Sequence, residues 1–101
     1  MNWQEVCADP NLQNLPYKIE LNQQGQIIMS PVKVIHGILQ SRISNLLFQS
    51  FGSGETIVEC AIATSAGTKS ADIAWCSAQR SEQIKSDTDA HIAPEICIEV
   101  M

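Results

Sequence analysis

Hydrophobic and polar residues alternate with a period of two in several stretches of the chain, and this pattern predicts short β-strands. Residues 17–21 and 26–30 show it on either side of a turn made of Asn, Gln and Gly, so they are predicted to form a β-hairpin. Residues 55–64 predict a third strand. Two shorter apolar runs, 71–76 and 95–100, predict strands buried on at least one face, although each contains acidic residues.

Between residues 32 and 51 the apolar period changes to that of an α-helix. Apolar side chains recur there at spacings of three and four residues: Ile35, Leu39, Ile43, Leu46 and Leu47. Residues 30–31 are a suitable start, and the glycines of 52–54 predict the end. His36 projects onto the apolar stripe and Gln40 onto its edge. Two interpretations of His36 stay open: a core histidine bonded to a backbone carbonyl, or a helix end that borders a polar cleft.

The remaining segments predict less regular structure. Residues 1–16 predict a short amphipathic start and then irregular backbone, with Trp3 and Val6 packed against the body. Residues 77–94 are polar and predict a long surface loop with a helical turn around 81–84. With 101 residues, 45% of them apolar and 17% charged, the chain can bury a core, which predicts a single domain over residues 1–101 of the α/β or α+β class.

The acidic residues of the predicted strands need an explanation, because a buried unpaired charge is costly. Asp72 lies in the run 71–76, and Glu99 in the run 95–100. Two acids on neighbouring strands could meet at a divalent cation that neutralises both; the alternative is that each lies at a frayed strand end and contacts water. Glu20 shares a strand face with Lys18 and is either an exposed edge residue or a functional one.

The formal net charge of −5 argues against a simple basic nucleic-acid binder, whose affinity would come from neutralising phosphates. It does not argue against a nuclease, because acids clustered around a cation lower the net charge by themselves. Four cysteines lack the spacing of a C-x-x-C or zinc motif: Cys7, Cys60, Cys76 and Cys97. Three of them lie in apolar strand-like runs, so we interpret them as reduced core residues rather than disulfide partners. Neither a signal peptide nor an apolar run of ~20 residues is visible, which predicts a cytoplasmic protein with no membrane partner.

Five short motifs, taken in order, resemble one family. They are PYKIEL (16–21), GQIIMSP (25–31), HG (36–37), ADIAW (71–75) and APEICIEV (93–100). Together they span nearly the whole chain and resemble the Uma-two-type group of endonucleases, within the PD-(D/E)XK restriction-endonuclease-like superfamily. The resemblance implies a restriction-endonuclease-like α/β/α core, with a mixed central β-sheet and one main helix in this chain, and a Mg²⁺-dependent site for phosphodiester hydrolysis.

The resemblance also implies site residues. Asp72 is similar to the Asp of the Pro-Asp pair, although Ala71 stands where proline is usual. Glu99 is similar to the acid of the (D/E)XK element, which implies that Asp72 and Glu99 bind Mg²⁺ or Mn²⁺. Glu20 and His36 match the acidic and histidine positions that border the site, and they complete the implied catalytic set.

The lysine of the superfamily motif is missing from its usual place, because residue 101 is Met. Relatives supply a lysine from a helix further along, and this chain stops before such a helix. It therefore resembles the N-terminal part of a longer family member, with the C-terminal part missing: a split gene, a truncation or a short paralogue. Lys69 is the cation nearest to Asp72 in the sequence, and we expect it to face solvent in its turn.

Two functions from different classes follow. In the first, the protein is a metal-dependent endonuclease that hydrolyses DNA phosphodiester bonds. In the second, it is a catalytically inactive relative that acts as a binding or assembly module. The last strand is predicted to be central in its sheet while one helix covers a single face, so we also expect a homodimer or larger oligomer with Ile96, Ile98 and Trp75 as contacts.

Overall fold

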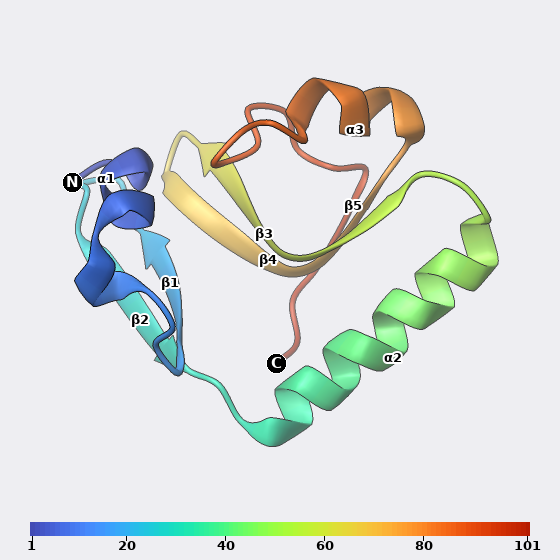
Figure 1. Cartoon of the computed structure of the whole chain (residues 1–101), viewed down its shortest axis with the longest axis horizontal. Coiled ribbons are helices and arrows are strands. Elements are labelled where there is room, and N and C mark those ends of the chain that lie inside the picture. Colours follow the sequence, from blue (N-terminus) through green and yellow to red (C-terminus); the bar gives the residue numbers. More distant parts are fainter.

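Two antiparallel sheets and one long helix make up the structure, a computed structural model that describes all residues, Met1–Met101 (Figure 1). The chain is thus an α+β protein, as predicted, with one main helix. The elements in order are α1 (Trp3–Ala8), the 3₁₀-helix η1 (Pro10–Leu12), β1 (Tyr17–Leu21), β2 (Ile27–Pro31), α2 (Val34–Phe51), β3 (Glu55–Thr64), β4 (Gly67–Cys76), α3 (Ala78–Ile84) and β5 (Ile96–Ile98).

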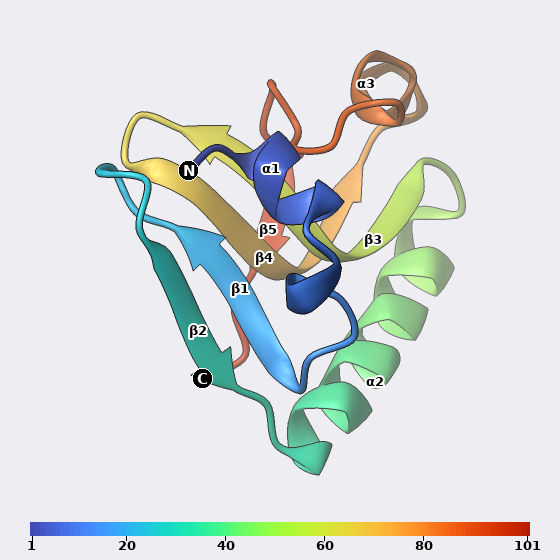
Figure 2. The same ribbon diagram turned by 60° about the vertical axis from the view of Figure 1, so that its left-hand side comes forward.

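The predicted hairpin is confirmed as the two-stranded sheet of β1 and β2. Its antiparallel register runs from Tyr17 opposite Pro31 to Leu21 opposite Ile27. The side chain of Asn22 stabilises the turn, because its Oδ1 accepts hydrogen bonds from the backbone N–H groups of residues 24 and 26 at 3.1 and 2.8 Å. β1 also contacts β4, and Figure 2 shows the hairpin beside the larger sheet.

The larger sheet has the strand order β3-β4-β5, and both pairs are antiparallel. The prediction of a mixed sheet is therefore wrong for the named strands; the one parallel contact is an isolated bridge between Ile62 and Ala90. A turn of two residues joins β3 to β4, and so short a connection allows only an antiparallel pair. The final strand, predicted to be central, is an edge strand of three residues, and β4 is central instead.

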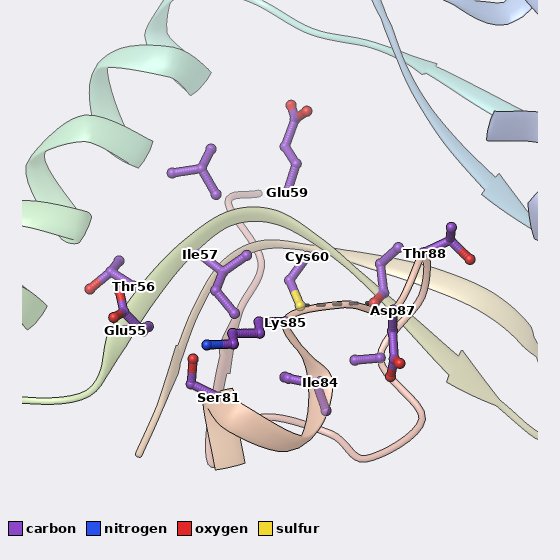
Figure 3. Close-up of a pocket in the computed structure, with 13 residues that line it drawn as sticks. Glu55, Thr56, Ile57, Glu59, Cys60, Ser81, Ile84, Lys85, Asp87 and Thr88 are labelled. Atoms are coloured by element: carbon purple, nitrogen blue, oxygen red, sulfur yellow. Dashed lines mark hydrogen bonds between the residues drawn. The ribbon is translucent and has the colours of Figure 1, made fainter. Parts of the chain in front are cut away.

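β3 bends sharply at Glu59, which has a positive φ of 57°. Such a conformation costs roughly 1–3 kcal/mol in a residue other than glycine. Ile57 and Cys60 are three residues apart and would face opposite sides of a regular strand, yet both pack against the same core cluster. Figure 3 shows both on the α3 side of β3 and Glu59 on the other side. The register places Glu59 opposite Asp72, so the bend occurs beside the buried acid of β4.

α2 and α3 lie on opposite sides of the three-stranded sheet (Figure 1). α2 ends where predicted, at Gly52 in the left-handed conformation, but it begins at Val34 after Lys33, which makes no side-chain capping bond. The predicted apolar stripe is partly wrong, because Ile35 and Leu46 are 53% and 61% exposed. The helix face that packs on the sheet is rotated about the helix axis relative to the predicted apolar stripe, and it includes the buried Gln40.

The two segments that the sequence predicted as irregular, residues 1–16 and 77–94, pack against the body of the protein. Val6 of α1 is buried, and Trp3 Nε1 donates a hydrogen bond of 3.0 Å to the carbonyl of Thr88, so the predicted packing of this segment is confirmed. Within the predicted loop 77–94, a two-turn helix (α3) replaces the single helical turn. All four cysteines are free; Cys60 and Cys76 are buried as predicted, whereas Cys97 is exposed because it lies on the edge strand.

The β1–β2 hairpin approaches the β3–β4 pair closely at Gly67, the first residue of β4. Gly67 has φ 106°, and a Cβ atom there would collide with the backbone of Leu21 and Asn22. Gly67→Ala should therefore lower the free energy of unfolding by more than about 2 kcal/mol in urea denaturation. Gly37→Ala is the matched control: Gly37 lies inside α2 with open space around it, so alanine should stabilise by about 0.5–1 kcal/mol. Equal stability of Gly67→Ala and the wild type would contradict this contact.

Candidate site around Asp72

Asp72 lies in the middle of the central strand and is 1% exposed. Its neighbours along β4 are buried as well, so the carboxylate lies away from the exposed strand ends. Of the two interpretations left open by the sequence, the frayed strand end is wrong for Asp72. A carboxylate in this position must be neutralised by the groups packed against it.

Three groups from different elements surround this carboxylate. Oδ2 accepts a hydrogen bond of 2.7 Å from the backbone N–H of Val100, which follows β5. Oδ1 lies 3.2 Å from Nζ of Lys18 on β1 and 3.3 Å from Nε2 of His36 on α2. These are ion-pair distances, but Oδ1 has no hydrogen bond of good geometry. Oδ2 thus has a hydrogen-bond donor, whereas Oδ1 lies near Lys18 and His36 without a hydrogen bond of good geometry.

Lys18 is the residue of the site that sequence reasoning missed. Its ammonium contacts Asp72 and also donates a hydrogen bond of 2.8 Å to Oε2 of Glu99, so it bridges the two acids. Lys69, the cation nearest to Asp72 in the sequence, forms no ion pair with it; Lys18, 54 residues away in the sequence, does. Alternation along β1 shows that Lys18 and Glu20 share a face, but only the packing of the hairpin against β4 brings that face to Asp72.

α2 places two polar side chains at the same point, as the helical projection predicted. Gln40 is 8% exposed, and its Nε2 donates a hydrogen bond of 2.9 Å to the backbone carbonyl of Asp72. The ring of His36 faces the Asp72 carboxylate rather than a backbone carbonyl. The interpretation of His36 as a core histidine bonded to a backbone carbonyl is therefore wrong; its ring pairs with a buried acid, and the polar cleft stays a prediction.

The two other acids of the predicted set occupy different positions. Glu99 follows the end of β5, and its side chain is 53% exposed, so the interpretation as a strand-end acid in contact with water holds for it. Glu20 does not join the cluster: its carboxylate accepts a hydrogen bond of 2.7 Å from the backbone N–H of Ser70, one strand period along β4 from Asp72. Glu20 neither contacts Asp72 nor is an exposed edge residue; its hydrogen bond to Ser70 joins β1 to β4.

The charges around Asp72 shift its pKa and that of its partner in opposite directions. Burial raises the pKa of Asp72, but the N–H of Val100 and the charges of Lys18 and His36 outweigh it and lower the pKa below its ordinary value. Burial lowers the pKa of Lys18, but the carboxylates of Glu99 and Asp72 outweigh it and raise the pKa above its ordinary value. Both residues are therefore charged at neutral pH, and two carboxylates face one ammonium.

Two cavities flank the sheet on opposite sides. One of about 420 Å³ is lined by Lys18, Ser70 and Glu59 together with the N-terminal segment, and so adjoins the cluster. The larger one, of about 560 Å³, lies between β3 and α3 (Figure 3). Cys60 lines the larger cavity, and burial raises the pKa of its thiol to about 11, which leaves almost no thiolate at neutral pH. We therefore assign the candidate site to the Asp72 cluster.

No three His, Cys, Asp or Glu side chains lie close enough together to hold a metal ion by themselves. Among the helices, none combines the length and apolar character that a bilayer span requires. Neither a family model nor a curated protein matches the chain at a significant level. The assignment to the Uma-two-type family therefore stays a prediction from the motifs.

The pKa shifts predict how stability depends on pH. The pKa of folded Asp72 is below its unfolded value, so its contribution is complete above about pH 5 and is lost as pH falls through the folded pKa. The pKa of folded Lys18 is above its unfolded value of about 10.5, so its contribution is complete at neutral pH and is lost only as pH rises through the folded pKa.

Urea denaturation of the wild type and Asp72→Asn between pH 2.5 and 9 tests this. The variant should be roughly 3–5 kcal/mol less stable from pH 5 to 9, because it leaves Lys18 with one carboxylate fewer. The difference should shrink below about pH 4. Glu82→Gln is the control, because Glu82 forms an exposed ion pair with Lys85; its difference from the wild type should stay small at every pH. A stability gap for Asp72→Asn that does not change with pH would contradict the ion pair.

Proposed function

We propose that this chain is a Uma-two-type, restriction-endonuclease-like domain that hydrolyses DNA phosphodiester bonds with Mg²⁺ or Mn²⁺. One observation carries the proposal: Asp72 on β4 and Glu99, just after β5, converge on the ammonium of Lys18. Two acids and a lysine are the residue types that the PD-(D/E)XK resemblance implies, and Lys18 supplies the lysine that position 101 lacks. The sequence resemblance and the geometry thus select the same place.

The oxygens of the cluster fit a divalent cation. Oδ1 of Asp72 is buried and has no hydrogen bond, and Oε2 of Glu99 lies 2.8 Å from the same ammonium. Mg²⁺ takes carboxylate oxygens and keeps several waters, so two carboxylates suffice. Held by Asp72 and Glu99, the cation would offset charge on the phosphate and lower the pKa of an attacking water.

The remaining side chains of the cluster have positioning and electrostatic roles in this proposal. Gln40 fixes the backbone of β4 at Asp72 through its hydrogen bond to the carbonyl. His36 orients Oδ1 from the helix side. Lys18 provides a positive charge that can stabilise the anion formed on the phosphate. Glu20 acts only through the backbone, since it holds Ser70 and thereby the position of Lys18.

Cleavage of supercoiled plasmid and single-stranded DNA with Mg²⁺ or Mn²⁺ tests the function. The wild type should cleave in a metal-dependent way, and Asp72→Asn, Glu99→Gln and Lys18→Met should each lose at least about a hundredfold in rate, because each removes a group that meets charge in the transition state. Glu82→Gln lies outside the cluster and should cleave like the wild type.

The result that would overturn the proposal is specific. Absence of cleavage by the folded wild type with either metal would reject the nuclease activity. Cleavage that survives Asp72→Asn would show that the activity belongs to a contaminant or to another site. Circular dichroism of each variant separates loss of chemistry from loss of fold.

A second candidate, an assembly module, is favoured by the outer face of α2. Large apolar side chains are exposed at several positions around this helix, with Val34 at 84%, Leu46 at 61% and Phe48 at 71% exposure. α2 contains a single formal charge, on Arg42, so like charges do not oppose contact between two copies of the helix. Trp75, expected with Ile96 and Ile98 at an interface on the uncovered side of the sheet, stacks on Phe51 of its own chain at 4.2 Å between ring centroids.

We therefore expect the chain to form a homodimer through α2 at micromolar concentration. Size-exclusion chromatography with light scattering should give twice the mass of 11.1 kDa. Phe48→Lys should restore the monomer, because it places a charge in the apolar contact. Gln49→Lys is the matched control on a neighbouring position of the same helix and should remain dimeric. A monomeric wild type would reject the interface without bearing on the Asp72 site.

A further inference from the structure

The place between the two carboxylates is taken by a side chain of the protein itself. Nζ of Lys18 lies 3.2 Å from Oδ1 of Asp72 and 2.8 Å from Oε2 of Glu99. Both oxygens thus contact the same nitrogen, and Oδ1 is buried without a hydrogen bond. A divalent cation bound by both oxygens would stand where the ammonium now stands.

We propose that Lys18 is a built-in competitor for the divalent cation, so that the metal binds at Asp72 and Glu99 only when the Lys18 ammonium leaves. This inference rests on the proposed function, because it concerns the same two carboxylates. It assigns a regulatory role to Lys18: the protein without metal is stabilised by the ion pairs of Lys18, and metal binding exchanges one cation for another. The displaced ammonium then acts on the phosphate only from the adjoining cavity that Lys18 lines.

Electrostatics makes the two occupants exclusive. A dication and an ammonium within about 4 Å repel each other strongly in a partly buried site. The side chain of Lys18 is only 14% exposed and that of Asp72 is 2% exposed, so little water is present to screen the repulsion. The oxygens cannot hold both cations at contact distance at once.

The structure also offers a place for the displaced ammonium. Lys18 lines the cavity of about 420 Å³ on that side of the sheet, and Glu59 lines the same cavity. The positive φ of Glu59 turns its side chain away from the α3 side, where its strand neighbours Ile57 and Cys60 point (Figure 3). A long, flexible lysine stem can therefore swing from one acidic environment toward another, and the strained backbone at Glu59 provides the second acid.

The first test measures metal affinity without activity. Electron paramagnetic resonance of free Mn²⁺ gives the affinity of the wild type, of Lys18→Met and of the control Lys85→Met, whose lysine pairs with Glu82 on the surface. Lys18→Met should bind Mn²⁺ at least about tenfold more tightly than the wild type, and Lys85→Met should match the wild type. Adding Asp72→Asn to Lys18→Met should abolish the gain.

The second test uses the wild type alone, which keeps the inference testable if Lys18→Met does not fold. Acetylation by an N-hydroxysuccinimide ester is followed by peptide mass spectrometry with and without Mg²⁺. The rate at Lys18 should rise severalfold with Mg²⁺, because the amine leaves its two carboxylates, whereas the rates at Lys33 and Lys85 should not change.

The outcomes distinguish failure of the competition by Lys18 from failure of the proposed metal site. Equal Mn²⁺ affinity of the wild type and Lys18→Met, lost in both on Asp72→Asn, would overturn the competition and leave the metal site intact. Absence of Mn²⁺ binding in both, with a constant acetylation rate at Lys18, would overturn the competition and the metal site together. Tighter binding by Lys18→Met that survives Asp72→Asn would place the metal elsewhere and also overturn the inference.

Discussion

The burial of Asp72 is the constraint on which the rest of the structure depends. A carboxylate that is 1% exposed requires neutralising partners, and three separate segments surround it. β1 supplies Lys18, α2 supplies His36 and Gln40, and the segment after β5 supplies the N–H of Val100. Because each contact joins β4 to a different element, the position of one side chain fixes how the hairpin, the helix and the C-terminal segment are arranged around the sheet.

The same point of the sheet carries its main distortion. β3 bends at Glu59, directly opposite Asp72, and the side chains of β3 change faces there. The change keeps Ile57 and Cys60 together in the core under α3 while Glu59 lines the cavity beside Lys18. A regular strand would put one of the apolar pair on the polar side. The strain at Glu59 thus allows one sheet to bury an apolar core and to border a charged site.

Periodicity in the sequence was sufficient to predict the strands, the main helix and the orientation of its polar residues. His36 and Gln40 follow from the period of the helix, and Asp72 follows from an acid inside an apolar run. Lys18 could not be found in this way, because its partners lie 54 and 81 residues away and the packing of the hairpin is a tertiary property. The central last strand was wrong for a similar reason: periodicity gives a strand's faces but not its neighbours. The mixed sheet was implied by the resemblance, and the named strands pair antiparallel instead.

Stability alone does not account for this cluster. The attraction within a buried ion pair is largely offset by the cost of desolvating both charges, and apolar residues of similar volume often stabilise as well or better. In the cluster, Oδ1 of Asp72 also lacks a good hydrogen bond, which leaves part of that cost uncompensated. A core built only for stability would place an apolar residue at position 72, as at its neighbours Ala71, Ile73 and Ala74. A charged group at the centre of the sheet lowers stability relative to that alternative, and the exchange of Lys18 for a divalent cation that we propose would give the cluster a role beyond stability.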